Sequence, residues 1–554
     1  MVRKLLRVMG RQIEGLHDAA YLLAFFAIVS HLLAVVRDRL FAHYFGASQA
    51  LDIYYAAFKI PDFIFVAVAS TVSFFVLIPF LHAHLERGTA REFLNSVFTA
   101  FFGIITLLAI GAYITMPFWL EILFEPLMQT ADGPLLVKMS RIMLLSPIIL
   151  GISNIYLSIT QTEKRFFVYA LSPVLYNLGI ILGILFLYPV FGITGLAYGV
   201  IFGALLHMAI QLPVISQAGL VPRFIGRVHW PTVRAVVATS LPRTLALTVS
   251  HAALLILVAL AAQSDEGSVA IFTFAHNLQS VPLSIIGISY SVAAFPTLAA
   301  YFTGGEQDKF NRSMMAAVRH ILFWSFPALV LFIVLRAQIV RTVLGTGEFT
   351  WADTRLTAAV VALFVVSLAA QGITMLFIRG YYAAGKTLKP LVISTIGAVV
   401  TVIFGYIGLD VFAGNETFAY FVEDMLRIAN IPGTEIVMLA AAYTLGMIAS
   451  ALIFWYVYRI DFGGTFPKRL YRTMTQSASA SILAGVATYG MLQVLDDIFD
   501  LGTLIGVFSQ GLFAGLVGIF VGIVLLYLMD NEELAEVWTT LHHKLWKADP
   551  VRVE

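Results

Sequence analysis

The chain has 554 residues, of which 60% are hydrophobic and only 12% are charged, and its formal net charge at pH 7 is +2. This composition excludes a water-soluble body, because too few polar side chains are present to cover its surface. The lack of cysteine excludes disulfides, iron–sulfur clusters and thiolate zinc sites.

The chain begins with a basic amphipathic segment, residues 1–18, which carries Arg3, Lys4, Arg7 and Arg11. No small-residue cleavage site follows the apolar run after it, so we expect no removable signal peptide. The segment is predicted to be a cytoplasmic N-terminus.

Long apolar stretches occupy most of the remaining sequence, and a membrane-spanning helix needs roughly 20 such residues. They predict an all-α polytopic membrane protein with about fourteen transmembrane helices. The predicted spans are residues 19–36, 53–81, 93–118, 135–159, 166–189, 193–214, 233–262, 269–298, 314–335, 356–384, 388–412, 436–457, 474–495 and 501–529.

Basic residues concentrate on the connections that share a side with the N-terminus, whereas the opposite side carries acidic connections such as the one with Glu121, Glu125 and Asp132. Because basic loops remain in the cytoplasm, both termini are predicted to be cytoplasmic. The tail, residues 530–554, is expected to form a short amphipathic surface helix. A second short helix is expected within residues 413–434, on the outer side.

A spaced pattern recurs in the second and eighth spans. A proline is followed by leucine, glycine and phenylalanine two, nine and fourteen residues later, and the two sets lie 217 residues apart: Pro79, Leu81, Gly88 and Phe93, then Pro296, Leu298, Gly305 and Phe310. Gly151-Ile152 and Gly372-Ile373 repeat at a separation of 221 residues. The pattern predicts two six-helix lobes as parallel repeats, followed by two C-terminal helices.

The predicted organisation follows from this repeat. It comprises an N-terminal lobe with the first six spans (19–216), a cytoplasmic linker (217–232), a C-terminal lobe with the seventh to twelfth spans (233–458), the last two spans (459–529) and the cytoplasmic tail (530–554).

Charged residues near the first two helices are the main candidates for a binding site, since a charge at the bilayer centre costs ~2.5 to 3.5 kcal/mol and needs a partner or a watery cavity. Arg37, Asp52 and Lys59 flank a tight turn at Phe45-Gly46-Ala47. They predict a cationic wall that suits an anionic headgroup, with Asp52 positioning or neutralising the cations.

The remaining charges of this region have a simpler interpretation. Arg39, His43 and Asp62 are expected to be interfacial residues whose charges reach toward water, and Asp38 is expected to pair with Arg37 or Arg39.

The eighth span carries His276, Asn277, Gln279 and Ser280 ahead of Pro282, which is expected to bend the helix and free backbone acceptors. These side chains are either part of the binding site or hydrogen-bonding glue between helices.

Further polar residues inside the predicted spans are either candidate site residues or contacts between helices. Arg243 is a further candidate, and Arg379 is a weaker one because it lies close to the interface. Single polar residues elsewhere are expected to be satisfied helix contacts: Asn177, His207, Gln211 and His251.

No nucleotide-binding loop, metal-ligand spacing or catalytic motif is found in the sequence. The chain is therefore predicted not to be an enzyme and to use no cofactor and no metal. Its expected partners are membrane lipids, and nucleic acid is not among them.

The chain resembles the MurJ (MviN) family of lipid II flippases, within the multidrug, oligosaccharidyl-lipid and polysaccharide exporter superfamily. The resemblance runs from about residue 20 to 395. It rests on Arg37-Asp38, Phe45-Gly46-Ala47, Asp52, Phe58-Lys59-Ile60-Pro61, Pro79, Ser172-Pro173-Val174-Leu175 with Asn177, Gly195-Leu196-Ala197, Gln211-Leu212-Pro213, Pro282, Phe295-Pro296-Thr297-Leu298, Gly347-Glu348-Phe349-Thr350, Tyr381-Tyr382-Ala383 and Pro390.

The resemblance implies a flippase of the bacterial plasma (inner) membrane. It would move an undecaprenyl-pyrophosphate-linked saccharide by alternating access between two lobes. The family's cavity arginine and nearby aspartates map onto Arg37, Asp38 and Asp52. Cell-wall synthesis proteins are candidate partners.

Several functional positions of the family do not carry over. A first-helix arginine is His31 here, and the eighth-helix acidic and basic positions are His276, Asn277 and Ser280. Phe65, Val66 and Ser70-Thr71 replace further polar positions. An unpaired pyrophosphate in a low-dielectric cavity is costly, so either His31, Lys59, Arg243 and His276 compensate or the substrate is less highly charged or different.

Two alternatives to a lipid II flippase stay open. In the first, the cargo is another polyprenyl-linked oligosaccharide, such as an O-antigen or capsule unit. In the second, the chain is a non-transporting scaffold in envelope assembly.

Overall fold

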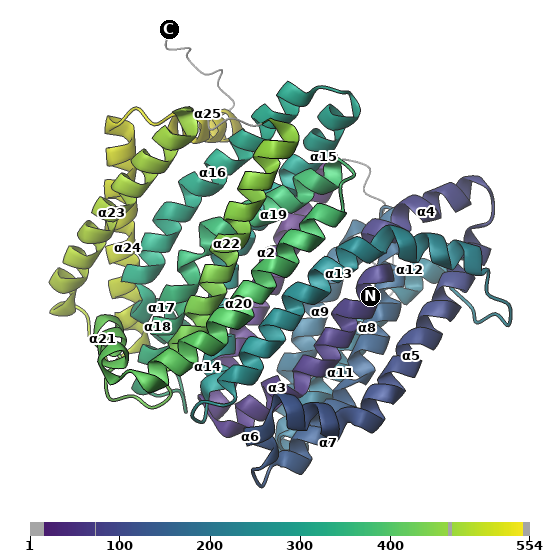
Figure 1. Ribbon diagram of the computed structural model, residues 1–554, viewed down its shortest axis with the longest axis horizontal. Helices are drawn as coiled ribbons and strands as arrows, with labels where there is room; N and C mark the ends of the chain where they lie inside the picture. Colours follow the sequence, from purple (N-terminus) through teal and green to yellow (C-terminus); the bar gives the residue numbers. More distant parts are fainter. Residues whose placement is uncertain (1–15, 73, 464–467, 547–554) are drawn as a thin grey trace. The chain divides into compact units, whose positions relative to one another are not determined.

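In the computed structural model, residues 16–72, 74–463 and 468–546 are described, and within them every regular element is a helix (Figure 1). The predicted N-terminal segment 1–18 lies almost entirely outside these ranges, as does the end of the tail after residue 546. In chain order the elements are α2 (Leu16–Phe45), α3 (Gln49–Ile64), η1 (Phe65–Ala69), η2 (Ser70–Val72), α4 (Phe74–Glu86), α5 (Ala90–Leu123), α6 (Glu125–Met128), α7 (Gly133–Met143), α8 (Leu145–Thr162), α9 (Phe166–Leu182), η3 (Gly183–Leu187), α10 (Tyr188–Phe191), α11 (Thr194–Ala209), α12 (Leu212–Gln217), α13 (Trp230–Ala261), α14 (Ser268–Leu283), η4 (Ser284–Ile288), α15 (Ser289–Thr303), α16 (Gln307–Val334), α17 (Arg336–Leu344), α18 (Trp351–Val366), α19 (Leu368–Ala383), α20 (Leu388–Gly414), α21 (Glu416–Leu426), α22 (Ile436–Phe462), α23 (Lys468–Asp496), α24 (Leu504–Leu528) and α25 (Glu532–Trp546).

The apolar stretches form the membrane helices that the sequence predicts. Within the described ranges, 12 helices are long and apolar enough to cross a membrane, or 13 if the bent pair Trp351–Val366 and Leu368–Ala383 is one span. The predicted first span, residues 19–36, lies inside α2. The all-α polytopic fold is confirmed.

The chain divides into two compact units, Met1–Ala270 and Ile271–Glu554. In the first unit, α9 packs against α2 and α11, and α13 packs against α3, α4 and α5. The seventh span thus has its contacts with the first six, whereas the predicted repeat places it at the start of the second lobe. The lobe boundaries therefore stay a prediction. In the second unit, α20 packs along α22, and α23 lies between α16 and α24 (Figure 1).

Breaks in the second and eighth spans recur at the spacing of the repeat. The π-helical turns Phe65–Ala69 and Ser284–Ile288 begin at residues 65 and 284, which are 219 apart. The second turn begins two residues after Pro282, whose ring removes a backbone donor, whereas the predicted bend of this helix stays a prediction. At the start of this turn, Ser284 Oγ donates a hydrogen bond to Val281 O at 2.8 Å.

Glycines bring α9 and α11 into backbone contact. A Cβ on Gly203 would lie 2.5 Å from the carbonyl oxygen of Tyr176, and a Cβ on Gly179 would lie 2.2 Å from the Cα of Gly203. Gly183 and Gly199 meet in the same way one turn further along, so only glycine fits at this helix interface.

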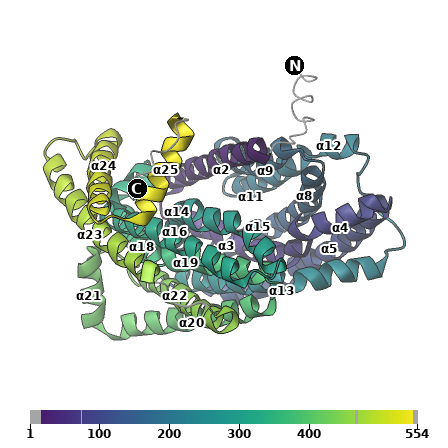
Figure 2. The same cartoon turned by 90° about the horizontal axis from the view of Figure 1, so that it is seen from above.

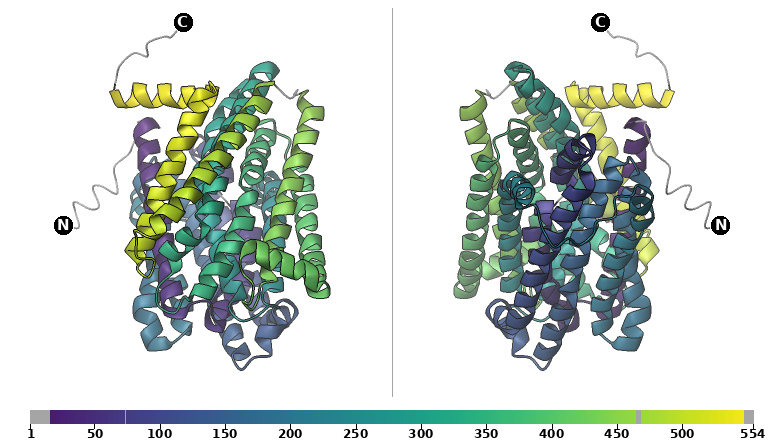
Figure 3. Two further views of the ribbon diagram at one scale, coloured as in Figure 1. Left: turned by 90° about the vertical axis from the view of Figure 1, so that its left-hand side faces the viewer. Right: turned by 90° about the vertical axis from the view of Figure 1, so that its right-hand side faces the viewer.

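Two short helices lie outside the predicted spans. The helix expected within residues 413–434 is present as α21, which runs between the ends of α20 and α22 (Figure 2). The helix expected in the tail is α25, which lies across the ends of α23 and α24 (Figure 3).

Candidate functional site

Arg37 is the centre of a polar cluster in the first unit. Its Nε and Nη2 donate to Oδ1 of Asp38 at 2.9 and 2.8 Å, and its Nη1 donates to Oδ1 of Asn177 in α9 at 3.1 Å. The Arg37 side chain is 20% exposed and that of Asp38 is 10% exposed. The expected pairing of Asp38 with Arg37 is confirmed, and the guanidinium charge is balanced inside the fold.

Asn177 holds this cluster in place. Its Nδ2 donates to Ser30 Oγ of α2 and to Pro173 O of its own helix, both at 3.3 Å. The side-chain oxygen of Asn177 accepts from Arg37, and its nitrogen is anchored on both α2 and α9. Asn177 therefore fixes the direction of the Arg37 side chain. The expectation of a satisfied helix contact is confirmed for Asn177, but its partner is the candidate binding residue itself.

Tyrosines surround the guanidinium. Tyr54 and Tyr55 of α3 and Tyr176 of α9 interact electrostatically with Arg37. Phe41 packs on Tyr54 with ring centroids 4.8 Å apart. The side chains of Tyr54 and Tyr55 are buried, and a charge in such surroundings interacts with an anion more strongly than it does in water. The sequence did not predict that Tyr54, Tyr55 and Tyr176 lie near Arg37, because tyrosines within apolar spans carry no distinguishing motif.

Lys59 belongs to a second group of charges in the first unit. Lys59 is partly buried and interacts with Asp62, which lies about one turn later in α3. Asp62 also interacts with His251 of α13. Asp62 is therefore a partner of Lys59, a relationship that its interpretation as an interfacial residue did not include.

Asp52 contacts backbone amides. Its side chain is buried, and its two carboxylate oxygens accept hydrogen bonds from Gly267 N at 2.7 Å and Ala270 N at 2.8 Å. These amides lie at the start of α14, where free N–H groups and the helix dipole favour a negative charge. The structure thus places the Asp52 carboxylate on a helix N-terminus, whereas the sequence predicted that it faces the cations.

The other predicted residues lie in separate surroundings. His31 is exposed on α2, and Arg243 is partly buried on α13. In the second unit, the His276 ring packs edge-on against Phe364 and Tyr443, with centroids 5.6 and 5.8 Å apart.

Asn277 is the remaining candidate of that unit, and its carbonyl accepts a hydrogen bond from Ser280 Oγ at 2.6 Å. Their convergence with Arg37 stays a prediction.

A buried amide network lies beside His276. Gln371 Nε2 donates to Gln279 Oε1 at 3.1 Å and to Ser367 Oγ at 2.8 Å, and Tyr443 Oη donates to Gln371 Oε1 at 3.2 Å. The network joins α14, α19 and α22, and Ser367 stands at the 44° bend between α18 and α19. For Gln279, the interpretation as hydrogen-bonding glue is the one that fits.

Three polar residues of the first unit, away from Arg37, hydrogen-bond to one another, although Oε1 of Gln211 has no hydrogen-bond partner among the described residues. Ser153 Oγ lies 2.7 Å from His207 Nδ1, and Gln211 Nε2 donates to Ser153 Oγ at 2.6 Å. All three side chains are buried. The predicted role of His207 and Gln211 as helix contacts is confirmed.

A pocket of about 740 Å³ lies in the second unit, between α15, α16, α23, α24 and α25. Its walls are mainly apolar and include Tyr290, Trp324, Ala480 and Ile519. Among the described residues, no group of three or more His, Cys, Asp or Glu side chains is arranged to hold a metal ion.

Two solved proteins share this architecture. A structure titled "Lipid II flippase MurJ, inward closed conformation" aligns with a TM-score of 0.72, at 22% identity, over 94% of this chain and all (100%) of that one. An inward-facing multidrug resistance MATE family transporter of the MOP superfamily aligns with a TM-score of 0.62, at 15% identity, over 78% of this chain and 94% of that one. The fold is therefore that of polytopic helical transporters.

Sequence comparison gives the particular family. The profile described as "Lipid II flippase MurJ" matches residues 41–508. A relative from Bdellovibrio bacteriovorus, "Probable lipid II flippase MurJ", is 28% identical over 397 residues, which are 69% of this chain and 75% of the relative. The chain belongs to the MurJ family.

Proposed function

We propose that the protein is a flippase that moves lipid II, the undecaprenyl-pyrophosphate-linked peptidoglycan precursor, across the bacterial plasma membrane. Membership of the MurJ family supports the cargo class. The observation that carries the proposal is Arg37, a cation of α2 whose side chain is only 20% exposed and is held by Asp38 and Asn177. A largely buried charge is costly to keep, and this cost supports a functional role for it.

The guanidinium has capacity left for a ligand. Arginine carries five N–H donors, and Asp38 and Asn177 use three of those of Arg37 among the described residues. The two remaining N–H groups suit a pair of phosphate oxygens, because guanidinium and phosphate match in a two-point geometry. Lys59 supplies a further positive charge, which Asp62 balances before the ligand binds.

The proposed transport cycle uses two lobes, residues 19–216 and 233–458, that rock about the bound headgroup. The recurrence of the π-helical turn after 219 residues supports this division, because it places an equivalent break in each half. His31, Arg243, His276 and Asn277 are proposed as additional contacts of the headgroup. Both termini are proposed to be cytoplasmic, in agreement with the basic connections on their side.

Translocation of lipid II in reconstituted vesicles tests the proposal. We expect Arg37→Ala to reduce the initial rate at least tenfold at equal protein content, whereas Arg234→Ala, which removes an exposed cation of α13, should leave it unchanged. Full activity of Arg37→Ala would overturn the role given to this residue. A wild-type protein without lipid II translocation in these vesicles would overturn the function.

A different polyprenyl-linked oligosaccharide is the second candidate cargo. It is favoured by the uncharged side chains at Phe65, Val66 and Ser70-Thr71, where the resemblance implies polar contacts. Complementation separates the two cargoes: a bacterium depleted of its own lipid II flippase should grow when this protein is expressed. Growth arrest despite normal membrane expression would support the second cargo.

A further inference from the structure

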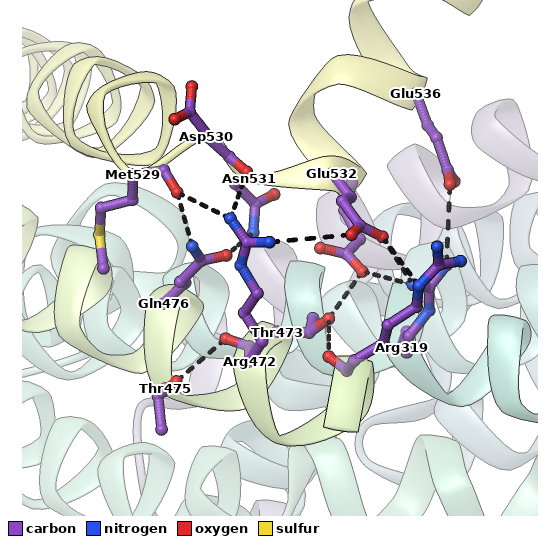
Figure 4. Close-up of polar contacts among 12 residues, drawn as sticks. Arg319, Arg472, Thr473, Thr475, Gln476, Met529, Asp530, Asn531, Glu532 and Glu536 are labelled. Atoms are coloured by element: carbon purple, nitrogen blue, oxygen red, sulfur yellow. Dashed lines mark hydrogen bonds and ion pairs between the residues drawn. The ribbon is translucent and has the colours of Figure 1, made fainter. Parts of the chain in front are cut away.

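Two cations of α7, in the first unit, have no carboxylate partner. In the second unit, by contrast, carboxylates of α25 balance a buried arginine: Arg319 of α16 lies 3.4 Å from both Glu532 and Glu533 (Figure 4). Among the described residues, no carboxylate lies within 4.0 Å of the side chain of Lys138 or of Arg141. These two residues are three positions apart and share one face of α7, where like charges repel each other. An anion between them would remove this repulsion.

A proline of α5 explains where the Arg141 side chain is held. Pro117 lies inside α5 and has no backbone N–H, so the carbonyl of Tyr113, four residues earlier, loses its usual donor. Arg141 Nε donates to this carbonyl at 3.0 Å, and the guanidinium lies over the Tyr113 ring, 4.6 Å from its centroid. This contact fixes the guanidinium on α5, but it uses only one of its N–H groups.

The two terminal nitrogens of Arg141 remain for a ligand. Of the five N–H donors of a guanidinium, those on Nη1 and Nη2 make no hydrogen bond among the described residues. They can donate to two oxygens of one phosphate at the same time. Lys138 is exposed one turn earlier in α7, and its ammonium adds further donors and a second positive charge. Together the two side chains suit one phosphate group.

An apolar pocket of about 690 Å³ adjoins these cations, between α5, α7, α8 and α11 (Figure 1). Lys138 and Arg141 belong to its lining, and its other walls are mainly apolar and include Ile110, Leu145, Ile148 and Tyr198. A pocket of this size is large enough for part of a small organic ligand. The combination of a cationic edge with apolar walls indicates an amphipathic anion.

One polar group inside the pocket also lacks a partner. The hydroxyl oxygen of Thr106 is buried in the pocket lining and makes no hydrogen bond among the described residues. Thr106 precedes Tyr113 by seven residues, which is about 10 Å along α5 at ~1.5 Å per residue. An occupant that reaches both Arg141 and Thr106 is therefore elongated, with a charged end and a hydrogen-bond acceptor further along an apolar body.

We propose that this pocket binds one anionic phospholipid. Its phosphate lies between Lys138 and Arg141, and its ester-linked chains run along the pocket toward Thr106, where an ester oxygen accepts from the hydroxyl. The headgroup is anionic rather than zwitterionic, because the two cations have no carboxylate beside them that could bind choline or ethanolamine. The proposal does not rest on the proposed function, because no residue of the pocket belongs to the candidate cargo site.

Protection of a cysteine tests the site, because the chain has no cysteine of its own. Leu145→Cys places a single thiol in the pocket lining, at a position that is 51% exposed. Leu107→Cys is the matched control, because Leu107 is 71% exposed on α5 and does not line the pocket. The rate of reaction with an uncharged maleimide in detergent micelles is expressed relative to this control, which removes any general effect of the added lipid.

We expect Leu145→Cys to react about fivefold more slowly with phosphatidylglycerol in the micelles than with an equal amount of phosphatidylcholine, the factor that one basic residue contributes at an anionic lipid surface. Equal relative rates in the two lipids would overturn the proposal. No lipid II is present in this experiment, so its failure leaves the proposed function untouched, and a failure of transport leaves this site untouched.

Substitutions of the two cations assign the protection to them. In the Leu145→Cys background, Lys138→Gln should reduce the protection and Lys138→Gln/Arg141→Gln should abolish it, whereas Arg234→Gln, which removes an exposed cation of α13, should leave it unchanged. Should the double variant fail to fold, Lys138→Gln decides, since Lys138 is exposed and makes no hydrogen bond among the described residues. Full protection in whichever of these variants folds would overturn the role of the cations.

Three further additives separate a phospholipid from other anions. Phosphatidic acid should protect Leu145→Cys as phosphatidylglycerol does, because both carry a phosphate and two apolar chains. Inorganic phosphate should give no protection, since it leaves the apolar walls uncovered, and oleate should protect less, since it lacks the phosphate. Protection by inorganic phosphate alone, or equal protection by oleate, would overturn the assignment to a phospholipid.

Discussion

The guanidinium of Arg37 folds back onto the carboxylate of Asp38, its immediate neighbour in α2, with Nη2 and Oδ1 2.8 Å apart. Adjacent residues of a helix point in different directions, so this contact constrains both side chains. It also leaves the far edge of the guanidinium directed to Asn177 of α9. The pair therefore neutralises a largely buried charge and orients it at the same time.

This relationship separates stability from transport. Arg37→Gln removes the guanidinium that pairs with the buried Asp38 carboxylate, and we expect a loss of about 3 kcal/mol in the free energy of unfolding together with loss of transport. The double variant Arg37→Gln/Asp38→Asn removes both charges, and we expect it to regain most of the stability.

Unfolding in mixed detergent micelles and lipid II translocation measure the two quantities. The double variant should remain inactive, because no cation is left for the headgroup. Recovery of transport in the double variant would show that Arg37 acts only by balancing Asp38.

Asp52 is expected to act through the start of α14. Asp52→Asn weakens acceptance from Gly267 N and Ala270 N and removes a negative charge from a helix N-terminus, so we expect a loss of about 1 to 2 kcal/mol in the free energy of unfolding. Thr350→Ala is a matched control, because Thr350 caps α18 at an exposed site. Its cost should be smaller, about 0.5 to 1 kcal/mol.

Thermal unfolding of the two variants in the same detergent compares these costs. If Asp52→Asn unfolds like the wild type but no longer transports lipid II, the carboxylate serves the cations or the cargo, as the sequence first suggested.

Features that depend on local chemistry could be predicted from the sequence. The break after Pro282 follows from a missing backbone donor, and the turn at Gly46 follows from glycine, which adopts a φ of +61° there. Apolar stretches of sufficient length located the membrane helices for the same reason, because the bilayer imposes a minimum length on each span.

Features that depend on tertiary contacts could not be predicted in this way. Asn177 and Arg37 are 140 residues apart, and neither periodicity nor spacing relates them. The amide partners of Asp52 were equally hidden, because any helix N-terminus attracts a carboxylate and the sequence does not say which one is near. The contact of Arg319 with α25 has the same origin, since it joins residues more than two hundred positions apart.

The amide network of the second unit gives a third prediction. Gln371→Met removes the partner of Gln279, Ser367 and Tyr443 and leaves buried polar groups unsatisfied. We expect a loss of about 1 to 3 kcal/mol in the free energy of unfolding. Gln263→Met, at an exposed position after α13, should change it by less than about 0.5 kcal/mol. Equal unfolding midpoints in detergent would contradict the network.

The glycine contact between α9 and α11 gives the fourth prediction. Gly203→Ala would place its Cβ 2.5 Å from the carbonyl oxygen of Tyr176, a distance at which backbone atoms must move. The two helices can separate only by giving up the contact of Gly183 with Gly199 as well, so we expect a loss of at least about 2 kcal/mol in the free energy of unfolding. Gly111→Ala is the matched control, because a Cβ there meets nothing within 4 Å.

The same separation should reach the candidate site, since α9 also carries Asn177. We therefore expect Gly203→Ala to lower lipid II translocation in vesicles, while Gly111→Ala keeps both stability and transport or gains slightly in stability through the better helix propensity of alanine. Wild-type stability of Gly203→Ala would mean that the two helices do not meet as closely as the structure places them. Lost stability with full transport would mean that the direction of Arg37 does not depend on the packing of α9.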